Sequence, residues 1–461
     1  MSQPVVLIIG TCDTKLDEIL YLREQIQRSG SCGTLIFDVS HTSQNTQRYA
    51  EWTEEVVAPC LDHSKDLADL PRGDYVDRAI EICLEPVKEM VTKGQIHGIV
   101  SAGGSTGSSL ACALMRKACP VGFPKLMVST MASGDIKPYV EETDITMMYS
   151  VVDIAGLNSI LKRILQNAAS AISAMAAAYA KSLTATSPST TAGGRRIGVS
   201  MFGVTTPAVD HIRRILSSPP YQDDGFEIYV FHATGAGGRA MERLIDEGQL
   251  DAVIDLTTTE IADELFGGVL TAGPDRLEAG ARKGIPQVVS VGACDMINFG
   301  PRESVPEQYN DRNLYQHNPT VTLMRTTKEN NLQIGKFIAS QLKTHASDPD
   351  KIKVLLPVGG VSMIDAPGQS FHDTEADSEL FKAIDEDLKG SGIEVEKFPD
   401  HINDEKFAAQ VCRALLEALD VDPRAYRLAN ARRRKWSFDH GASVNMVRRT
   451  SEIKIPDVSE A

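Results

Sequence analysis

Short apolar segments alternate with longer amphipathic segments along most of the chain. Between the first two apolar segments, Lys15–Arg28 carries Leu16, Ile19, Leu22 and Ile26 at the spacing of one helix face. Strands that alternate with helices are typical of βαβ units and a mainly parallel sheet. In the first part of the chain the pattern predicts strands at Val5–Ile9, Thr34–Val39, Gly98–Ser101, Lys125–Ser129 and Ile145–Tyr149.

A long Ala-rich helix is expected over Asn158–Leu183, and residues 184–194 after it are rich in Ser, Thr and Gly without a hydrophobic face. We interpret 184–194 as a linker between an N-terminal domain, 1–183, and a C-terminal domain, 195–422, followed by a polar, basic tail over 423–461. After the linker the pattern predicts a second doubly wound α/β domain, with strands at Ile197–Met201, Glu227–Phe231, Ala252–Leu256, Gln287–Val291, Lys353–Pro357 and Val395–Phe398.

The composition is that of a globular protein, with 42% hydrophobic and 24% charged residues among 461. A net charge of −15 argues against nucleic-acid binding, which needs a basic face, and the basic run Arg432–Lys435 is interpreted as a solvated tail segment. No apolar run reaches the ~20 residues of a membrane helix, and no secretory signal is evident. The eight cysteines lack Cys-x-x-Cys spacing. We therefore expect a cytoplasmic protein with reduced thiols and no nucleic-acid or membrane partner.

Polar and glycine-rich clusters fall just after predicted strands, where open parallel sheets bind ligands. The first cluster opens the predicted helix Lys15–Arg28. Amide groups at a helix N-terminus favour phosphate, the threonines and the lysine add donors, and the aspartate can hold Mg²⁺ through water. The alternative is an ordinary helix cap with a surface lysine. The candidate ligand-binding residues of this cluster are Gly10, Thr11, Asp13, Thr14 and Lys15.

Two further clusters, Ser101–Ser109 and Ser129–Asp135, follow the predicted strands Gly98–Ser101 and Lys125–Ser129. Glycines let a backbone approach a ligand closely, and hydroxyls can contact phosphate oxygens. Neither the Walker A ending nor the Gly-x-Gly-x-x-Gly spacing is present. Each cluster alone has the alternative of an unliganded turn, but three on one sheet edge favour a shared site. The further candidates are Gly103, Gly104, Ser105, Thr106, Gly107, Ser133, Gly134 and Asp135.

Polar clusters also follow the strands predicted in the second half and indicate a second cleft. The loop Gly235–Arg239 resembles an anion-binding nest with an arginine for a carboxylate or phosphate. No local ligand spacing supports a metal centre, so the sequence favours structural or substrate-facing histidines. A Ser-His-Asp triad stays open, although no Gly-x-Ser-x-Gly elbow supports it. The candidate anion-binding and proton-transferring residues are His232, Arg239, His317, Arg325 and His372.

Several longer runs resemble one known family, that of the tomato mosaic virus resistance protein, whose bacterial and fungal members form an uncharacterised family with an ATP-binding domain. The likeness covers residues 4 to 420, and long matching runs are more specific than any single glycine loop. The runs that carry it are Ile9–Lys15, Lys125–Asp135, Asp144–Asn158, Met201–Pro207, Phe231–Met241, Asp255–Leu265, Asp295–Pro301 and His317–Thr327.

The resemblance implies two Rossmann-like domains, ATP with Mg²⁺ in the N-terminal one, and a homodimer. It assigns ATP to the loops around Asp13, Lys15, Gly103–Gly107 and Ser133–Asp135. In one hypothesis ATP is a structural or regulatory ligand, because no recognisable phosphoryl-transfer motif is present. In the other, ATP drives chemistry on a small anionic metabolite in the second cleft, where arginines bind the anion and histidines shuttle protons.

Overall fold

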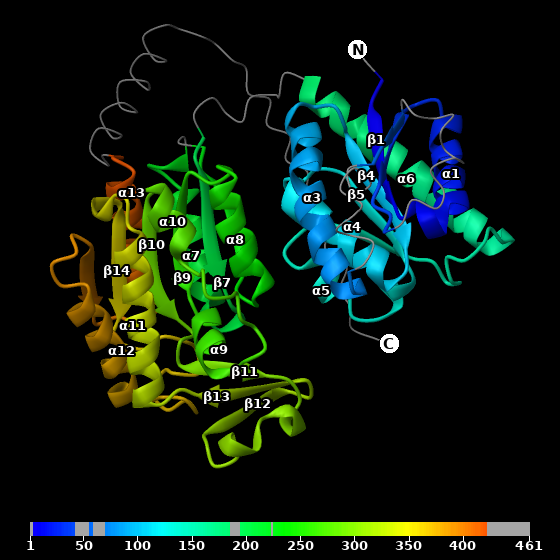
Figure 1. Ribbon diagram of the computed structural model, residues 1–461. Helices are drawn as coiled ribbons and strands as arrows, with labels where there is room; N and C mark the ends of the chain where they lie inside the picture. The colour runs from blue at the N-terminus through cyan, green and yellow to red at the C-terminus, as the bar shows by residue number, and fades with distance from the viewer. Residues whose placement is uncertain (1–2, 42–54, 59–69, 185–193, 223–224, 422–461) are drawn as a thin grey trace, which may run out of the picture.

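The computed structural model describes residues 3–41, 55–58, 70–184, 194–222 and 225–421. These residues form two α/β domains, each built on a six-stranded parallel sheet (Figure 1). Every strand predicted above is present, with ends within one or two residues of the prediction. The predicted fold, two doubly wound and mainly parallel sheets, is therefore confirmed. The run Arg432–Lys435 and residues 185–193 of the predicted linker lie outside the described residues.

The first sheet has the strand order β3-β2-β1-β4-β5-β6, and all neighbouring strands are parallel. This is the order of dinucleotide-binding Rossmann domains. The chain winds outward from β1 to β3, returns, and winds the other way from β4, so a topological switch point lies between β1 and β4. The strands are β1 (Val5–Gly10), β2 (Gly33–Asp38), β3 (Val56–Val57), β4 (Gly98–Gly103), β5 (Lys125–Ser129) and β6 (Thr146–Tyr149).

Helices bury both faces of this sheet. On β1, Val6 and Ile8 pack with the helices of one face, while Leu7 and Ile9 pack with those of the other, because successive side chains alternate across a strand. Burial on both faces explains why these strands read as continuous apolar runs. The covering helices are α1 (Cys12–Arg28) and α6 (Ser159–Thr184) on one face, and α3 (Arg72–Thr92) and α4 (Ser105–Ala118) on the other.

The second sheet has a different order, β15-β14-β10-β9-β7-β8, again parallel throughout. Here the chain reverses its direction of winding between β7 and β9, as in flavodoxin-like sheets. The strands are β7 (Arg196–Met201), β8 (Glu227–His232), β9 (Ala252–Thr257), β10 (Gln287–Gly292), β14 (Ile352–Pro357) and β15 (Glu394–Phe398). The helices that flank it are α7 (Thr206–Leu216), α8 (Ala236–Asp246), α9 (Glu260–Phe266), α10 (Glu278–Lys283), α11 (Lys328–His345), α12 (Thr374–Asp387) and α13 (Glu405–Ala418).

A small antiparallel sheet in the C-terminal domain was not predicted from the sequence. Its strand order is β11-β13-β12, and β12 is largely exposed to solvent. Because β12 is short and has polar, exposed positions, it lacks the apolar run that marks the parallel strands, and local pattern does not reveal it. The other two strands are buried but only four and five residues long. The strands are β11 (Met296–Phe299), β12 (Leu314–Asn318) and β13 (Val321–Arg325).

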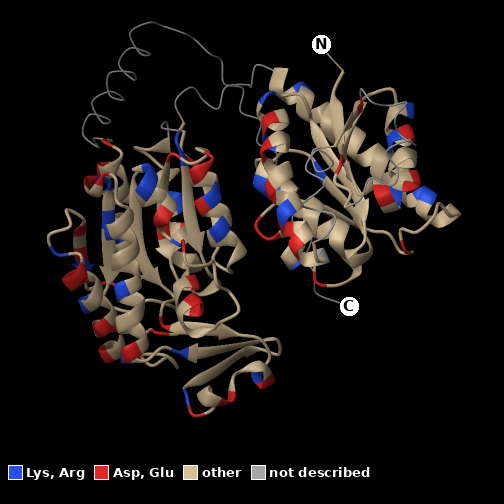
Figure 2. Cartoon of the chain, viewed as in Figure 1, with Lys and Arg blue, Asp and Glu red and all other residues tan. Residues whose placement is uncertain are grey.

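Charged residues belong mainly to helices and loops, whereas the strands of both sheets are mostly uncharged (Figure 2). The domains touch through Arg243 on α8, which donates a hydrogen bond to the carbonyl of Cys119 at 2.5 Å and pairs with Glu142 at 3.2 Å.

Among the described residues, no helix has the length and apolar character needed to cross a membrane.

Candidate functional site

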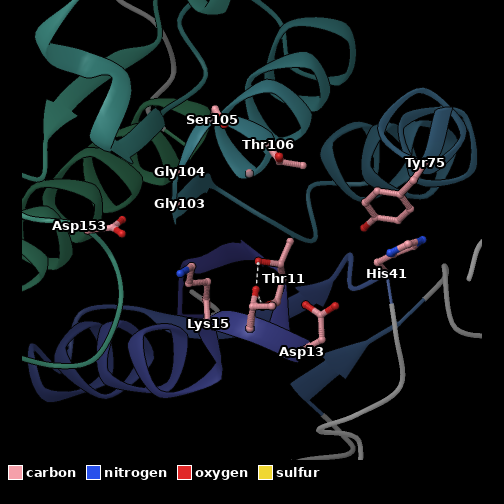
Figure 3. A pocket seen from close by; sticks show the side chains of 12 residues that line it. Thr11, Asp13, Lys15, His41, Tyr75, Gly103, Gly104, Ser105, Thr106 and Asp153 are labelled. Carbon is pink, nitrogen blue, oxygen red and sulfur yellow. Dashed lines mark hydrogen bonds between the residues drawn. The ribbon is translucent and has the colours of Figure 1, made fainter. Parts of the chain in front are cut away.

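A cavity of about 370 Å³ lies beyond the carboxyl ends of β1 and β4, at the switch point of the first sheet. Open α/β sheets bind ligands in such crevices, and the volume lies within the usual range for small-ligand sites. Figure 3 shows side chains from several elements facing this space. The cavity is lined by Thr11, Asp13, Thr14, Lys15, His41, Tyr75, Gly103, Gly104, Ser105, Thr106, Gly107 and Asp153.

The first turn of α1 is already capped from within the protein. The carboxylate of Asp38, at the end of β2, accepts a hydrogen bond from the N–H of Cys12 at 3.2 Å, and the Ser40 hydroxyl accepts one from the N–H of Asp13 at 2.8 Å. The next two amides donate to the carbonyl of Thr11. Because these bonds satisfy the amides that would otherwise meet an anion, the N-terminus of α1 has little to offer a phosphate.

The N-terminus of α4 is open by comparison. Its N-cap residue, Gly104, has no side chain, and no side-chain cap hydrogen bond forms there. The first backbone hydrogen bond of the helix runs from the N–H of Ser108 to the Gly104 carbonyl at 2.9 Å. Residues 105–107 come before this bond in the chain and line the cavity, so their amides belong to the helix end that has no partner within the helix. With the hydroxyls of Ser105 and Thr106 and the positive end of the helix dipole, these amides make a surface whose chemistry suits an anion.

Small residues hold this helix end directly against the sheet. A Cβ on Gly103 would lie 3.3 Å from the Cα of Gly107, so a side chain there would push strand and helix apart. The Ser108 hydroxyl lies 2.6 Å from the Ser129 hydroxyl, which ties α4 to β5. The position of this helix end is therefore fixed by the packing of α4 on the strand ends.

Lys15 lines the cavity, and α1 is kinked at this residue. Its backbone has φ −126° and ψ 21°, outside the helical region. Its ammonium group donates a hydrogen bond to the carbonyl of Ile154, in the loop after β6. Asp13 and Asp153 bring two carboxylates to the same cavity. One cation and two carboxylates beside the start of α4 suit a phosphate accompanied by a divalent cation.

An aromatic pair lines the cavity at the end opposite Lys15 and Asp153 (Figure 3). The ring centroids of His41 and Tyr75 lie 4.4 Å apart, with an angle of 46° between the ring planes. Tyr75 lies on α3 and is buried, and its hydroxyl donates a hydrogen bond to the carbonyl of Val39. The position of the tyrosine ring is therefore set by the fold.

In the C-terminal domain, the glycine loop before α8 does form a nest, but its anion belongs to the protein. The carboxylate of Glu260 accepts hydrogen bonds from the N–H of Gly235 at 2.7 Å and from the N–H of Gly238 at 3.0 Å. A Cβ on Gly238 would collide with this carboxylate. Arg239 donates to the carbonyl of Thr271 at 3.0 Å. The nest is therefore filled by a carboxylate of the protein itself, and the prediction that it binds an external anion is wrong.

Glu260 also belongs to a buried ion cluster around Arg276. The guanidinium donates to Glu260 at 3.0 Å, to Glu242 at 2.9 Å, and to Asp255. Burial raises the pKa of Glu242 to about 7, and burial raises the pKa of Glu260 although Arg276 acts in the opposite direction. Because all three nitrogens of Arg276 are bonded within the protein, this cluster joins α8, β9 and α9 rather than binding a ligand.

Arg325, on β13, is likewise buried and internally paired. Its guanidinium lies 2.7 Å from the carboxylate of Asp377 and 3.5 Å from that of Asp365, and it donates to the carbonyl of Phe371 at 2.6 Å. With Asp295 these residues make up what we call the Arg325 cluster. Burial raises the pKa values of Asp295 and Asp365 to about 6 and that of Asp377 to about 7. The guanidinium predicted to bind a substrate anion is thus surrounded by the protein's own carboxyls.

The candidate histidines lie on different elements. His232 ends the edge strand β8, with its ring edge-on to Phe202 at 5.5 Å, and His317 is exposed on β12. One ring nitrogen of His372 lies 2.7 Å from the carbonyl oxygen of Asp365. Within the described ranges, no group of three or more His, Cys, Asp and Glu side chains is placed to hold a metal ion.

Two family models cover most of the chain. The N-terminal domain of the "Uncharacterised protein family (UPF0261)" matches residues 4–181, and the C-terminal domain of the same family matches residues 195–419. The chain belongs to the UPF0261 family. A UPF0261 protein of Clostridium tetani is 43% identical over 419 residues, which cover 90% of this chain and 99% of that protein.

The UPF0261 family also links this chain to a plant protein. The ToMV resistance protein Tm-1(GCR237) of Solanum lycopersicum is 37% identical over 433 residues, which cover 90% of this chain and 56% of the tomato protein. The resemblance noted in the sequence is thereby confirmed. A solved structure of a putative UDP-N-acetylglucosamine 2-epimerase from Listeria monocytogenes shares 11% identity over 63% of this chain and 79% of its own, with a TM-score of 0.22, too low to bear on function.

In this UPF0261 chain, all candidates from the first two loops except Gly10 line the cavity. Gly10 instead lies against α1, where a Cβ would meet a side chain at 2.7 Å. The candidates from the third loop are not among the lining residues. There, the carboxylate of Asp135 accepts a hydrogen bond from the N–H of Lys137 at 3.0 Å, in a capping turn, while Ser133 and Gly134 belong to the preceding turn and its cap.

Three cavity residues of the UPF0261 chain were missed by sequence analysis. His41 and Asp153 follow β2 and β6, so the same rule about residues after strand ends would have found them if it had been applied to these two strands. Tyr75 lies on α3 and carries no local signal, because only packing of α3 on the sheet brings it to the cavity.

Proposed function

We propose that the cavity between β1 and β4 binds ATP, with the phosphates on the N-terminus of α4. The observation that carries this proposal is an open helix N-terminus in a cavity of about 370 Å³ at the switch point of a parallel sheet. Oriented amides and a helix dipole favour an anion there, although the chain as a whole carries a net charge of −15.

The contrast between the two helix ends supports α4 as the helix that receives the phosphates. Asp38 and Ser40 take up the first amides of α1, so that helix contributes side chains rather than backbone groups. The backbone groups come from α4, and Lys15 adds a positive charge from α1. This division of roles supports a polyphosphate that spans both loops rather than a single phosphate on one helix.

Magnesium fits the proposal as a companion of the phosphates. Mg²⁺ usually keeps several waters and is held by one or two carboxylates together with substrate phosphates. Asp13 and Asp153 are the carboxylates that line the cavity, and either can contact such an ion directly or through water. The role we propose is binding: ATP stabilises the folded protein by mass action, about 2.7 kcal/mol at a hundredfold excess over Kd.

The test is isothermal titration of the purified protein with MgATP, together with the ATP-dependent rise in melting temperature. Lys15→Ala is expected to weaken ATP binding about tenfold or more, because a charge-assisted hydrogen bond contributes ~1.5–3 kcal/mol. Lys181→Ala, at the exposed end of α6, is the matched control and should leave the affinity unchanged.

The two possible failures have different meanings. If the wild-type protein neither binds ATP nor melts at a higher temperature in its presence, the proposal is wrong. If wild type binds ATP but Lys15→Ala binds it equally well, ATP occupies another place or does not use this lysine. Circular dichroism of the variant checks that loss of the bond to Ile154 has not unfolded the first domain.

A further inference from the structure

The two ends of the N-terminal cavity differ in chemistry. At one end lie the ammonium group of Lys15 and the carboxylate of Asp153, and at the other lie the rings of His41 and Tyr75 (Figure 3). The glycine loop and the start of α4 lie along the cavity between them. A nucleotide also has two unlike ends, a charged polyphosphate and an aromatic base.

We infer that the nucleotide lies in one direction, with its base against the His41–Tyr75 pair and its terminal phosphate toward Lys15 and Asp153. This inference rests on the proposed function and adds the polarity of the ligand and the residues that recognise its base. His41 is the base-recognition residue in this assignment, and Tyr75 supports it.

The geometry of the aromatic pair supports this direction. Tyr75 is 3% exposed and held by its bond to the Val39 carbonyl, so it is a fixed backing for the histidine ring 4.4 Å away. His41 is less buried than Tyr75 and presents its ring to the cavity. A ring in that position offers an aromatic base a stacking surface, and stacking accepts any base because every base has a π-face.

The charged groups support the same direction. The amides at the start of α4 lie between the two ends and suit the inner phosphates, which are nearest to the base. Lys15 lies beyond them, on the side away from the aromatic pair, and its ammonium group is anchored to the Ile154 carbonyl. A terminal phosphate at that place meets the lysine and also an Asp153-bound Mg²⁺. With the opposite direction, the base would lie between a lysine and a carboxylate, without an aromatic surface.

The experiment compares three ligands, ATP, AMP and inorganic tripolyphosphate, on the full chain with Mg²⁺. His41→Ala is expected to weaken ATP and AMP by the same factor, roughly 5- to 150-fold, because stacking of one base is lost, and to leave tripolyphosphate unchanged. Lys15→Ala is expected to weaken ATP and tripolyphosphate and to affect AMP far less. His41→Phe keeps a ring without the imidazole and should retain most of the ATP affinity.

Each other outcome has a definite meaning. If His41→Ala weakens tripolyphosphate while Lys15→Ala weakens AMP, the nucleotide lies in the opposite direction. If His41→Ala leaves the affinity for ATP unchanged, the base does not contact this ring and the inference is overturned, although ATP binding stands. If wild type binds none of the three ligands, the proposed function itself is wrong.

Discussion

Replacing Glu260 by glutamine is expected to destabilise the C-terminal domain by about 3 kcal/mol. The carboxylate accepts two hydrogen bonds from Gly235 and Gly238 with one oxygen and one from Arg276 with the other. Glutamine has nearly the same shape, but only one of its two terminal atoms accepts hydrogen bonds. If its oxygen faces the glycine amides, its NH₂ group faces the guanidinium of Arg276, donor against donor.

The magnitude follows from the burial of the pair and from what remains after the change. Both side chains are at most 1% exposed, and removal of one partner from such a buried pair costs ~3–5 kcal/mol. Arg276 keeps Asp255 and Glu242, so we expect the lower end of this range. A loss of about 3 kcal/mol lowers the ratio of folded to unfolded domain by roughly a hundredfold.

The assay is urea denaturation followed by far-UV circular dichroism, with hydrogen exchange at the amides of Gly235 and Gly238 as a local measure. Glu375→Gln is the matched control, because Glu375 pairs with Lys328 at the surface, where the side chains are 76% and 50% exposed. Surface pairs contribute ~0–1 kcal/mol, so the control should change little. If Glu260→Gln matched the control in both measurements, the nest would hold a protonated carboxyl, which behaves like an amide, and our account of the ion cluster would be wrong.

Two further changes test the C-terminal domain. In the folded state burial raises the pKa values of the carboxyls of the Arg325 cluster to about 6 to about 7, above the ~3.9 of an unfolded aspartate. Between the unfolded and the folded pKa values, the folded state therefore binds more protons than the unfolded state. Stability should therefore fall as pH rises through that window, and a urea midpoint that rose between pH 5 and pH 8 would contradict this. Gly237→Ala should destabilise by ~2 kcal/mol or more, because its Cβ would collide with the carbonyl of His232. Gly203→Ala, whose Cβ meets nothing within 4 Å, should stay within ~0.5 kcal/mol of wild type in the same urea assay, and equal midpoints for the two variants would rule out the collision.

The strands of both parallel sheets were predictable because each is a short apolar run buried on two faces. Val5–Gly10 is an example: its side chains alternate between two layers of helices, so almost every position must be apolar. The strand Leu314–Asn318 was not predictable for the opposite reason, since its positions are mostly exposed and carry no such constraint. Candidate ligand residues at the starts of α1 and α4 were predictable because they follow buried strands directly in the chain.

The sequence alone therefore determined the α/β class, the alternation of strands and helices, the family, and the loops that line the cavity, because these depend on residues that are near one another in the chain. Only the tertiary structure decided which helix end is open. Asp38 and Ser40 cap α1 from 26 and 27 residues away, and this leaves α4 to face the cavity. It also decided that the nest at Gly235 holds Glu260, 25 residues further on. Both the capped end of α1 and the filled nest depend on the order in which the parallel strands pair. That order brings carboxylates and hydroxyls from distant parts of the chain to the sheet edge where they accept hydrogen bonds from these amides.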